Sequence, residues 1–147
     1  MTRVDFHFNA PDKIGYGCRL LRKVYRSGRR AVVYCDDGGR LARLDEQLWT
    51  FSPLDFIPHV LASDRLAPRT PIVLTAAAGD TPHHEVLINL GEAMPPFFSR
   101  FERLIEVVTA EPDDRDRARE RFRFYKDRGY PLETHDLSSD AGRRETE

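Results

Sequence analysis

Apolar residues recur along the chain with two different periods. Residues 4–9 place Val4, Phe6 and Phe8 at every second position, which predicts a strand. Short apolar runs bounded by turn residues predict four more strands, at 30–37, 71–76, 85–90 and 104–110. A helical period predicts helices over 15–28, 39–51 and 112–129, and a short helix over 95–102.

Alternation of strands and helices predicts an α/β layer fold with a mostly parallel sheet of about five strands. The 147 residues suit one domain. We expect that domain to span residues 1–137, because residues 138–147 are polar and predict a frayed tail.

The overall charge and the cysteines limit the possible classes of protein. Lys plus Arg number 23 and Asp plus Glu 24, so the chain lacks the basic excess of proteins that coat DNA electrostatically. Cys18 and Cys35 form no metal-binding pattern and are expected to be buried, reduced thiols of a cytoplasmic protein. No signal-peptide pattern or apolar run of membrane-spanning length is present, so no membrane association is expected.

The sequence contains a weak dinucleotide-binding pattern. Gly15 and Gly17 follow the first predicted strand, and Asp36 ends the second, which leaves an NAD(P)-binding, oxidoreductase-like domain as an alternative. However, Leu20 occupies the third glycine position, and the first glycine lies six residues beyond the strand. No P-loop, nucleophile elbow or metal-ligand set occurs, so we expect no cofactor, no metal and no catalytic activity.

The helix predicted at 112–129 separates its basic residues from its acidic residues, Asp116, Glu120 and Asp127. Arg115, Arg119, Arg123 and Lys126 form a basic stripe, and Phe122 borders the neighbouring apolar face. Cations beside an aromatic ring suit an acidic peptide that ends in a hydrophobic residue. Helix pattern alone, however, favours a solvated amphipathic helix, because charge stripes are common and surface ion pairs contribute little.

Two other segments allow binding functions. The run 48–61 combines Trp49, Phe56 and Pro58 and could be core or an apolar surface for a partner protein. The run 19–30 carries six basic residues and no acidic ones, which leaves direct binding of single-stranded nucleic acid as an alternative. We expect a solvated first helix there instead.

Several short motifs together resemble the chi subunit family of bacterial DNA polymerase III. They are "VDFHF" at 4–8, "YRSGRR" at 25–30, "RLDEQLW" at 43–49, "DFIPH" at 55–59 and "RERFRFYKDRGYPL" at 119–132. The resemblance implies a Rossmann-like fold of three layers without a nucleotide site, in a non-enzymatic subunit for DNA replication. It implies binding to the acidic C-terminal tail of single-stranded DNA-binding protein and to psi of the clamp-loader assembly, with a helicase as a further partner and mostly indirect contact with DNA.

Carried over by position, the resemblance assigns two sets of site residues. The tail-binding set is Arg115, Arg119, Phe122, Arg123 and Leu132. The psi-binding set is Trp49, Phe56 and Pro58. The basic helix is therefore expected to receive a protein tail rather than DNA.

Overall fold

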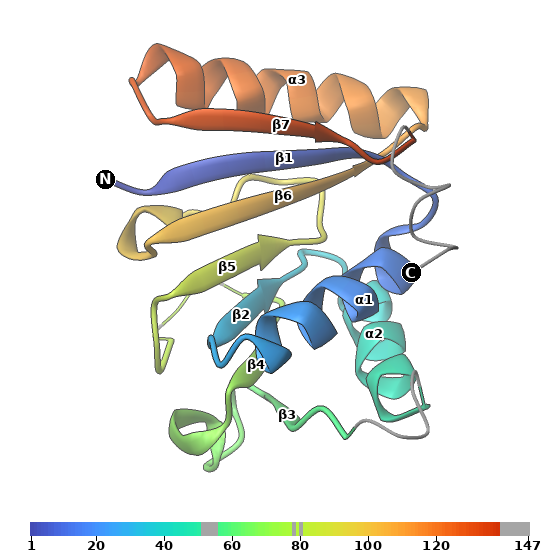
Figure 1. The fold of residues 1–147 in the computed structure, drawn as a ribbon, viewed down its shortest axis with the longest axis vertical. Helices are drawn as coiled ribbons and strands as arrows, with labels where there is room; N and C mark the ends of the chain where they lie inside the picture. Colours follow the sequence, from blue (N-terminus) through green and yellow to red (C-terminus); the bar gives the residue numbers. More distant parts are fainter. Residues whose placement is uncertain (51–55, 78, 80, 139–147) are drawn as a thin grey trace.

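The computed structural model describes residues 1–50, 56–77, 79 and 81–138, and in them all seven strands form one parallel sheet (Figure 1). The strand order is β3-β4-β2-β5-β6-β1-β7. The strands are β1 (Arg3–Ala10), β2 (Ala31–Tyr34), β3 (His59–Leu61), β4 (Ile72–Thr75), β5 (Val86–Asn89), β6 (Arg103–Thr109) and β7 (Leu132–Asp136). The predicted α/β, Rossmann-like class is confirmed, but the sheet has seven strands where about five were expected.

The two additional strands are the two edges of the sheet. β3 has only three residues and follows Pro58, and β7 has the sequence LETHD, with no apolar alternation. Both pair with a single neighbour, β3 with β4 and β7 with β1. Such strands are defined by backbone pairing rather than by burial, so hydrophobic periodicity does not detect them.

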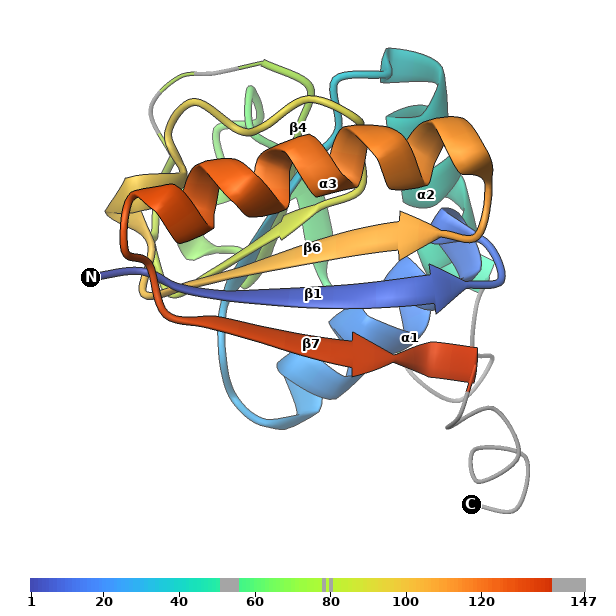
Figure 2. The ribbon, with the colours of Figure 1, turned by 90° about the horizontal axis from the view of Figure 1, so that it is seen from above.

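Helices cover both faces of the sheet and give the fold three layers (Figure 2). Helices α1 (Lys13–Arg26) and α2 (Gly38–Thr50) pack on one face, where their side chains join a buried cluster with Val33, Ile88 and Ile105. Helix α3 (Pro112–Asp127) packs on the other face with Leu104 and Val108. The helix expected at 95–102 is the 3-10 turn η2 (Phe98–Arg100), and a second such turn is η1 (Ala67–Arg69).

Local signals explain where the long helices begin and end. The side chain of Asp12 caps α1 by accepting a hydrogen bond from the Gly15 backbone N–H at 2.6 Å. Pro112 begins α3, and acidic residues in its first turn complement the helix dipole. Gly28 and Gly129 follow α1 and α3 with φ of 79° and 81°, a conformation that side chains disfavour.

A buried ion pair joins the helices of the two outer layers at the carboxyl ends of the strands. Lys13 Nζ at the start of α1 lies 2.8 Å from Asp114 Oδ1 in the first turn of α3. Lys13 also donates to the Gly91 carbonyl at 3.0 Å, and Asp114 accepts from the Thr109 backbone N–H at 2.8 Å. Both charged groups are therefore hydrogen-bonded as well as paired, as buried charges require.

Candidate protein-binding sites

A buried glutamate fixes the position of α3 on the sheet. Glu106 of β6 is fully buried and accepts hydrogen bonds from Asn89 Nδ2 (2.8 Å), Arg121 Nε (3.2 Å) and Tyr125 Oη (2.7 Å). Burial, and next the adjacent Glu106 carboxylate, raise the pKa of Tyr125 far above its ordinary value, so its hydroxyl remains a hydrogen-bond donor. Arg121 thus belongs to the core of the interface between α3 and the sheet, unlike the exposed arginines of the same helix.

An apolar cavity opens between α3 and the sheet, with a volume of about 150 Å³. Its lining is Phe6 and Phe8 of β1, Val108 of β6, Thr134 of β7, and Arg115, Ala118, Arg119 and Phe122 of α3. The rings of Phe6 and Phe122 meet edge to face with centroids 5.3 Å apart. We call this space the tail cavity, because three of the five residues predicted for tail binding line it.

The electrostatics of the tail cavity suit a carboxylate at its mouth. Arg115 forms no ion pair with any residue that the structure describes, and Arg119 pairs only with Asp116, at 3.2 Å. In that pair the side chains of Arg119 and Asp116 are 61% and 69% exposed, so water screens the attraction and the pair contributes little. Both guanidinium groups can therefore turn toward an incoming anion without breaking a strong contact.

A second candidate surface lies where α2 ends and β3 begins. The rings of Trp49 and Phe56 have centroids 5.4 Å apart, and their residues are 52% and 65% exposed. The ring of the buried His59 packs against the Trp49 ring, with their centroids 4.2 Å apart. Pro58 is half-buried beside them, and Leu61 adds a third exposed apolar side chain. We call Trp49, Phe56, Pro58 and Leu61 the apolar patch; residues 51–55, within the run 48–61, lie outside the described residues.

Comparison with known proteins decides the family. The family model described as DNA polymerase III chi subunit, HolC, matches residues 1–133. A protein of Pseudomonas aeruginosa named DNA polymerase III subunit chi is 38% identical over 141 residues, which cover 93% of this chain and 98% of that protein. The chain belongs to the DNA polymerase III chi subunit family. The resemblance found in the sequence is thus confirmed, and with it a place in bacterial DNA replication.

Two further chi subunits show lower identity over most of the chain. The Haemophilus influenzae protein is 28% identical over 121 residues, 82% of this chain and 84% of its own length. The Escherichia coli protein is 29% identical over 118 residues, 80% of each chain.

The structure brings together only part of the tail-binding set predicted for this chi-family chain. Arg115, Arg119 and Phe122 line the tail cavity. Arg123 is exposed one turn beyond Arg119 and does not line it, and Leu132 is half-buried, packed against the core beneath α3. The roles of Arg123 and Leu132 stay predictions.

Sequence reasoning missed the part of the tail cavity that the strands supply. The sequence pattern predicts that Phe6 and Phe8 lie in a strand, and their alternation marks the face that a helix should cover. Which helix covers that face depends on β1 lying beside β6, a pairing that the sequence pattern does not reveal. Thr134 gave no signal at all, since β7 itself was not predicted.

The glycines of the weak dinucleotide pattern lie inside helix α1 of the chi fold. A Cβ on Gly17 would lie 2.9 Å from Leu90 Cδ1, so the buried Leu90 side chain, which follows β5, would have to shift to accept any larger residue in α1. Asp36, the third residue of that pattern, accepts a hydrogen bond from the Glu92 backbone N–H at 3.0 Å. Packing and loop contacts account for Gly17 and Asp36 in the described structure.

Two further findings concern the cysteines and the apolar character of the helices. Cys18 and Cys35 are buried free thiols, as expected. Among the helices of the described residues, none combines the length and apolar character needed to cross a membrane.

Proposed function

We propose that this chi-family chain is a non-catalytic accessory subunit of DNA polymerase III that connects the clamp-loader assembly to single-stranded DNA-binding protein. The tail cavity would bind the acidic C-terminal tail of that protein, and the apolar patch would bind psi. The observation that carries the proposal is an apolar cavity with two weakly engaged arginines at its mouth.

The dimensions of the tail cavity fit one hydrophobic side chain. An apolar cavity of about 150 Å³ is large enough for a benzene ring, and this one is lined by the rings of Phe6, Phe8 and Phe122. A terminal hydrophobic side chain would enter it, while Arg115 and Arg119 would hold the terminal carboxylate by charge-assisted hydrogen bonds. Acidic residues preceding the tail's end would meet Arg123, the next basic residue of the stripe, one turn beyond Arg119.

The apolar patch has the composition of a protein-binding surface. Aromatic residues dominate the binding energy of most interfaces, and exposed rings in contact with one another are preorganised to bind. Trp49 and Phe56 are such a pair, and they lie beside the exposed edge strand β3. Since Trp49 is the only tryptophan in the chain, its fluorescence would report binding of purified psi directly.

The first test is a fluorescence-anisotropy titration with a labelled peptide copying the acidic tail of a bacterial single-stranded DNA-binding protein. We expect saturable binding that is lost when the last hydrophobic residue is removed. Arg119→Glu should weaken binding by at least about 2 kcal/mol, or about 30-fold, because repulsion replaces a charge-assisted contact.

The matched control is Lys126→Glu, the same charge reversal on an exposed position of α3 outside the tail cavity. We expect this variant to change the affinity for the peptide by less than about fivefold, because the altered charge acts only at long range and salt screens it. Equal losses for Arg119→Glu and Lys126→Glu would show general attraction rather than a defined site. Equal affinity for the full and the truncated peptide would refute the role of the cavity.

A further inference from the structure

A second recess lies on the opposite face of the sheet from the tail cavity. Parallel sheets are normally covered on both faces, yet β1 points Arg3, Asp5 and His7 toward the α1 side, where a helical cover would require apolar residues. Between α1 and strands β6 and β1 lie two adjoining cavities of about 500 and 560 Å³, which share His7, Leu20, Lys23 and Arg103. We call them together the α1 groove.

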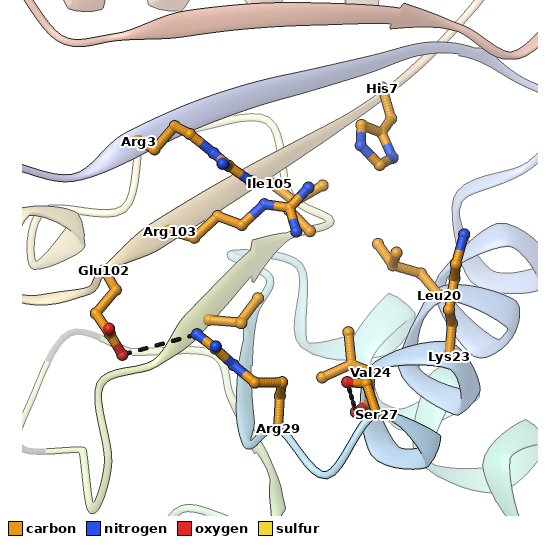
Figure 3. Close-up of a pocket in the computed structure, with 11 residues that line it drawn as sticks. Arg3, His7, Leu20, Lys23, Val24, Ser27, Arg29, Glu102, Arg103 and Ile105 are labelled. Carbon is orange, nitrogen blue, oxygen red and sulfur yellow. Dashed lines mark hydrogen bonds and ion pairs between the residues drawn. The ribbon is translucent and has the colours of Figure 1, made fainter.

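Cationic side chains line the α1 groove on both walls. Figure 3 shows Arg3 and Arg103 extending from the strands into the space that faces α1, with Lys23 on the helix side. The cationic lining residues are Arg3, Arg19, Arg22, Lys23, Arg26, Arg29 and Arg103. Glu102 is the one acidic residue among the described lining residues, and it pairs with Arg29 at 3.8 Å. The chain as a whole carries a net charge of -1, so this concentration of positive charge is local.

Part of this charge has no partner in the described part of the chain. Arg3 and Arg103 flank the buried Asp5 carboxylate, at 3.7 and 2.5 Å, so one negative charge there balances two positive ones. Arg19 and Lys23 form no ion pair with a described residue, and Arg19 lies over the Tyr16 ring at 5.8 Å. Among the described residues, Arg3, Arg103, Arg19 and Lys23 therefore carry more positive charge than the acidic groups facing them balance, which favours binding of an anion.

We propose that the α1 groove binds the phosphate backbone of single-stranded DNA. Arg19, Lys23 and Arg26 stand about one helical turn apart, roughly 5 Å, and face arginines of the sheet, so a strand lying along α1 meets cations on both sides. His135 offers an exposed ring at one end of the groove, a suitable surface for stacking of a base.

A single strand fits this recess better than a duplex. Each half of the groove has the volume of a small-molecule site, which a flexible strand can enter. A duplex is wide and stiff and would touch only the rim, leaving Arg3 and Arg103 on the sheet wall unused.

The lining also distinguishes DNA from an acidic peptide ending in a hydrophobic residue. The apolar residues at the floor of the groove, among them Leu20 and Ile105, are 8% and 1% exposed. The rings of Phe6, Phe8 and Phe122 line the tail cavity, whereas the described lining of the α1 groove contains no phenylalanine to receive a hydrophobic side chain. An anion that binds here gains from charge and stacking, which a phosphate backbone with bases supplies.

The residues at the base of the α1 groove suit a metal ion less well than an anion. Asp5, His7 and His135 each place one ligand atom within 4.8 Å of the others. However, Arg3 and Arg103 already engage the Asp5 carboxylate, so a cation would have to displace them. The cationic walls favour an anion.

The proposal has a consequence for the bound complex. The tail cavity uses Phe6 and Phe8 on one face of β1, and the α1 groove uses Arg3 and His7 on the other. One molecule could therefore hold the protein tail and the DNA strand at the same time. The two activities are also separable by mutation.

The test is a titration of a labelled 15-nucleotide oligo(dT) with the full chain, followed by anisotropy at several salt concentrations. If three or four phosphates are neutralised, the slope of log K against log salt should be about -2 to -3. Arg19→Gln with Lys23→Gln, both exposed, should reduce the magnitude of that slope by about 1.4 and weaken binding about tenfold at low salt. Affinity for the acidic tail peptide should not change.

The matched control is Arg65→Gln with Arg69→Gln, two exposed arginines near η1 outside the groove. We expect it to bind oligo(dT) within about twofold of the unmodified chain, as surface charges remote from a site act only weakly. Equal losses in both double variants, or no binding of oligo(dT) at 50 mM salt, would overturn the proposal. It would also be overturned if duplex DNA, or a Glu-rich peptide of equal charge, bound the groove as tightly as oligo(dT).

Discussion

Asp114→Asn should destabilise the fold strongly, because it breaks the buried ion pair between α1 and α3. The substitution leaves the Lys13 ammonium buried without its counter-charge, 2.8 Å from where the carboxylate was. Removing one partner of a buried pair typically costs about 3–5 kcal/mol. Here the Gly91 carbonyl still accepts from Lys13, and the Asn carbonyl can still accept from Thr109, so we expect the lower end, about 3 kcal/mol. For a domain of this size that corresponds to a fall in Tm of about 9 °C.

Urea unfolding and calorimetry would measure the loss, and Asp113→Asn provides a matched control. Asp113 stands in the same first turn but is exposed, so it shares the helix-dipole contribution without the buried pair. We expect Asp113→Asn to cost less than about 1 kcal/mol. Adding Lys13→Met to Asp114→Asn should restore much of the stability, because the unpaired charge is gone. Equal costs for the two Asn variants, or no recovery with Lys13→Met, would refute the reasoning.

The same pair predicts a dependence of stability on pH. Burial acts to raise the pKa of Asp114, but hydrogen bonds from Lys13 and Thr109 outweigh it and hold the pKa below its ordinary value. A depressed folded-state pKa stabilises the protein above the unfolded value, near 3.9, and this contribution is lost as pH falls through the folded value. The Asp114→Asn variant should therefore lose less stability than the unmodified chain between pH 5 and 3.

Three more predictions test other buried groups. Tyr125→Phe removes the 2.7 Å hydrogen bond to the Glu106 carboxylate and should cost about 2 kcal/mol in urea unfolding; an unchanged midpoint would contradict it. Burial raises the pKa of Cys18 to about 11 and also raises that of Cys35, so an aromatic disulfide reagent at pH 8 should modify both only after unfolding. Rapid reaction of the native protein would count against this burial. Burial lowers the pKa of His83, so its contribution to stability should be lost as pH falls from about 6.5, and His83→Gln should flatten the fall in Tm between pH 7 and 5. An identical fall in both proteins would contradict that assignment.

Elements with a strong hydrophobic period were predictable from the sequence, and those defined by pairing were not. The apolar period places α1 and α2, and for α3 the start and stop signals Pro112 and Gly129 mark the ends correctly. β7 has no such period, because its residues are largely exposed and its place depends on β1. The sequence therefore indicated the helical wall of the tail cavity and gave no indication of the strand that completes it.

The charge pattern of the sequence also did not distinguish buried basic residues from exposed ones. Arg121 looks like one more basic residue of α3, yet it is buried against Glu106. A glutamate in the middle of the apolar run LIEVV was a signal that a buried partner must exist, but the sequence alone does not say which arginine supplies it. The sequence of α1 alone predicts a solvated basic helix. In the structure, Arg3 and Arg103 come from strands distant in sequence and form a second cationic wall of the α1 groove.

The pairing of the first strand with the last has a consequence during synthesis on the ribosome. Val4 pairs with Leu132, so β1 emerges long before the strand that covers its edge. Thr134 belongs to the tail cavity and His135 to the α1 groove, so neither recess is complete until β7 has left the exit tunnel and docked. A truncation before residue 132 would therefore lack both complete recesses and would leave β1 as an open sheet edge, which favours aggregation.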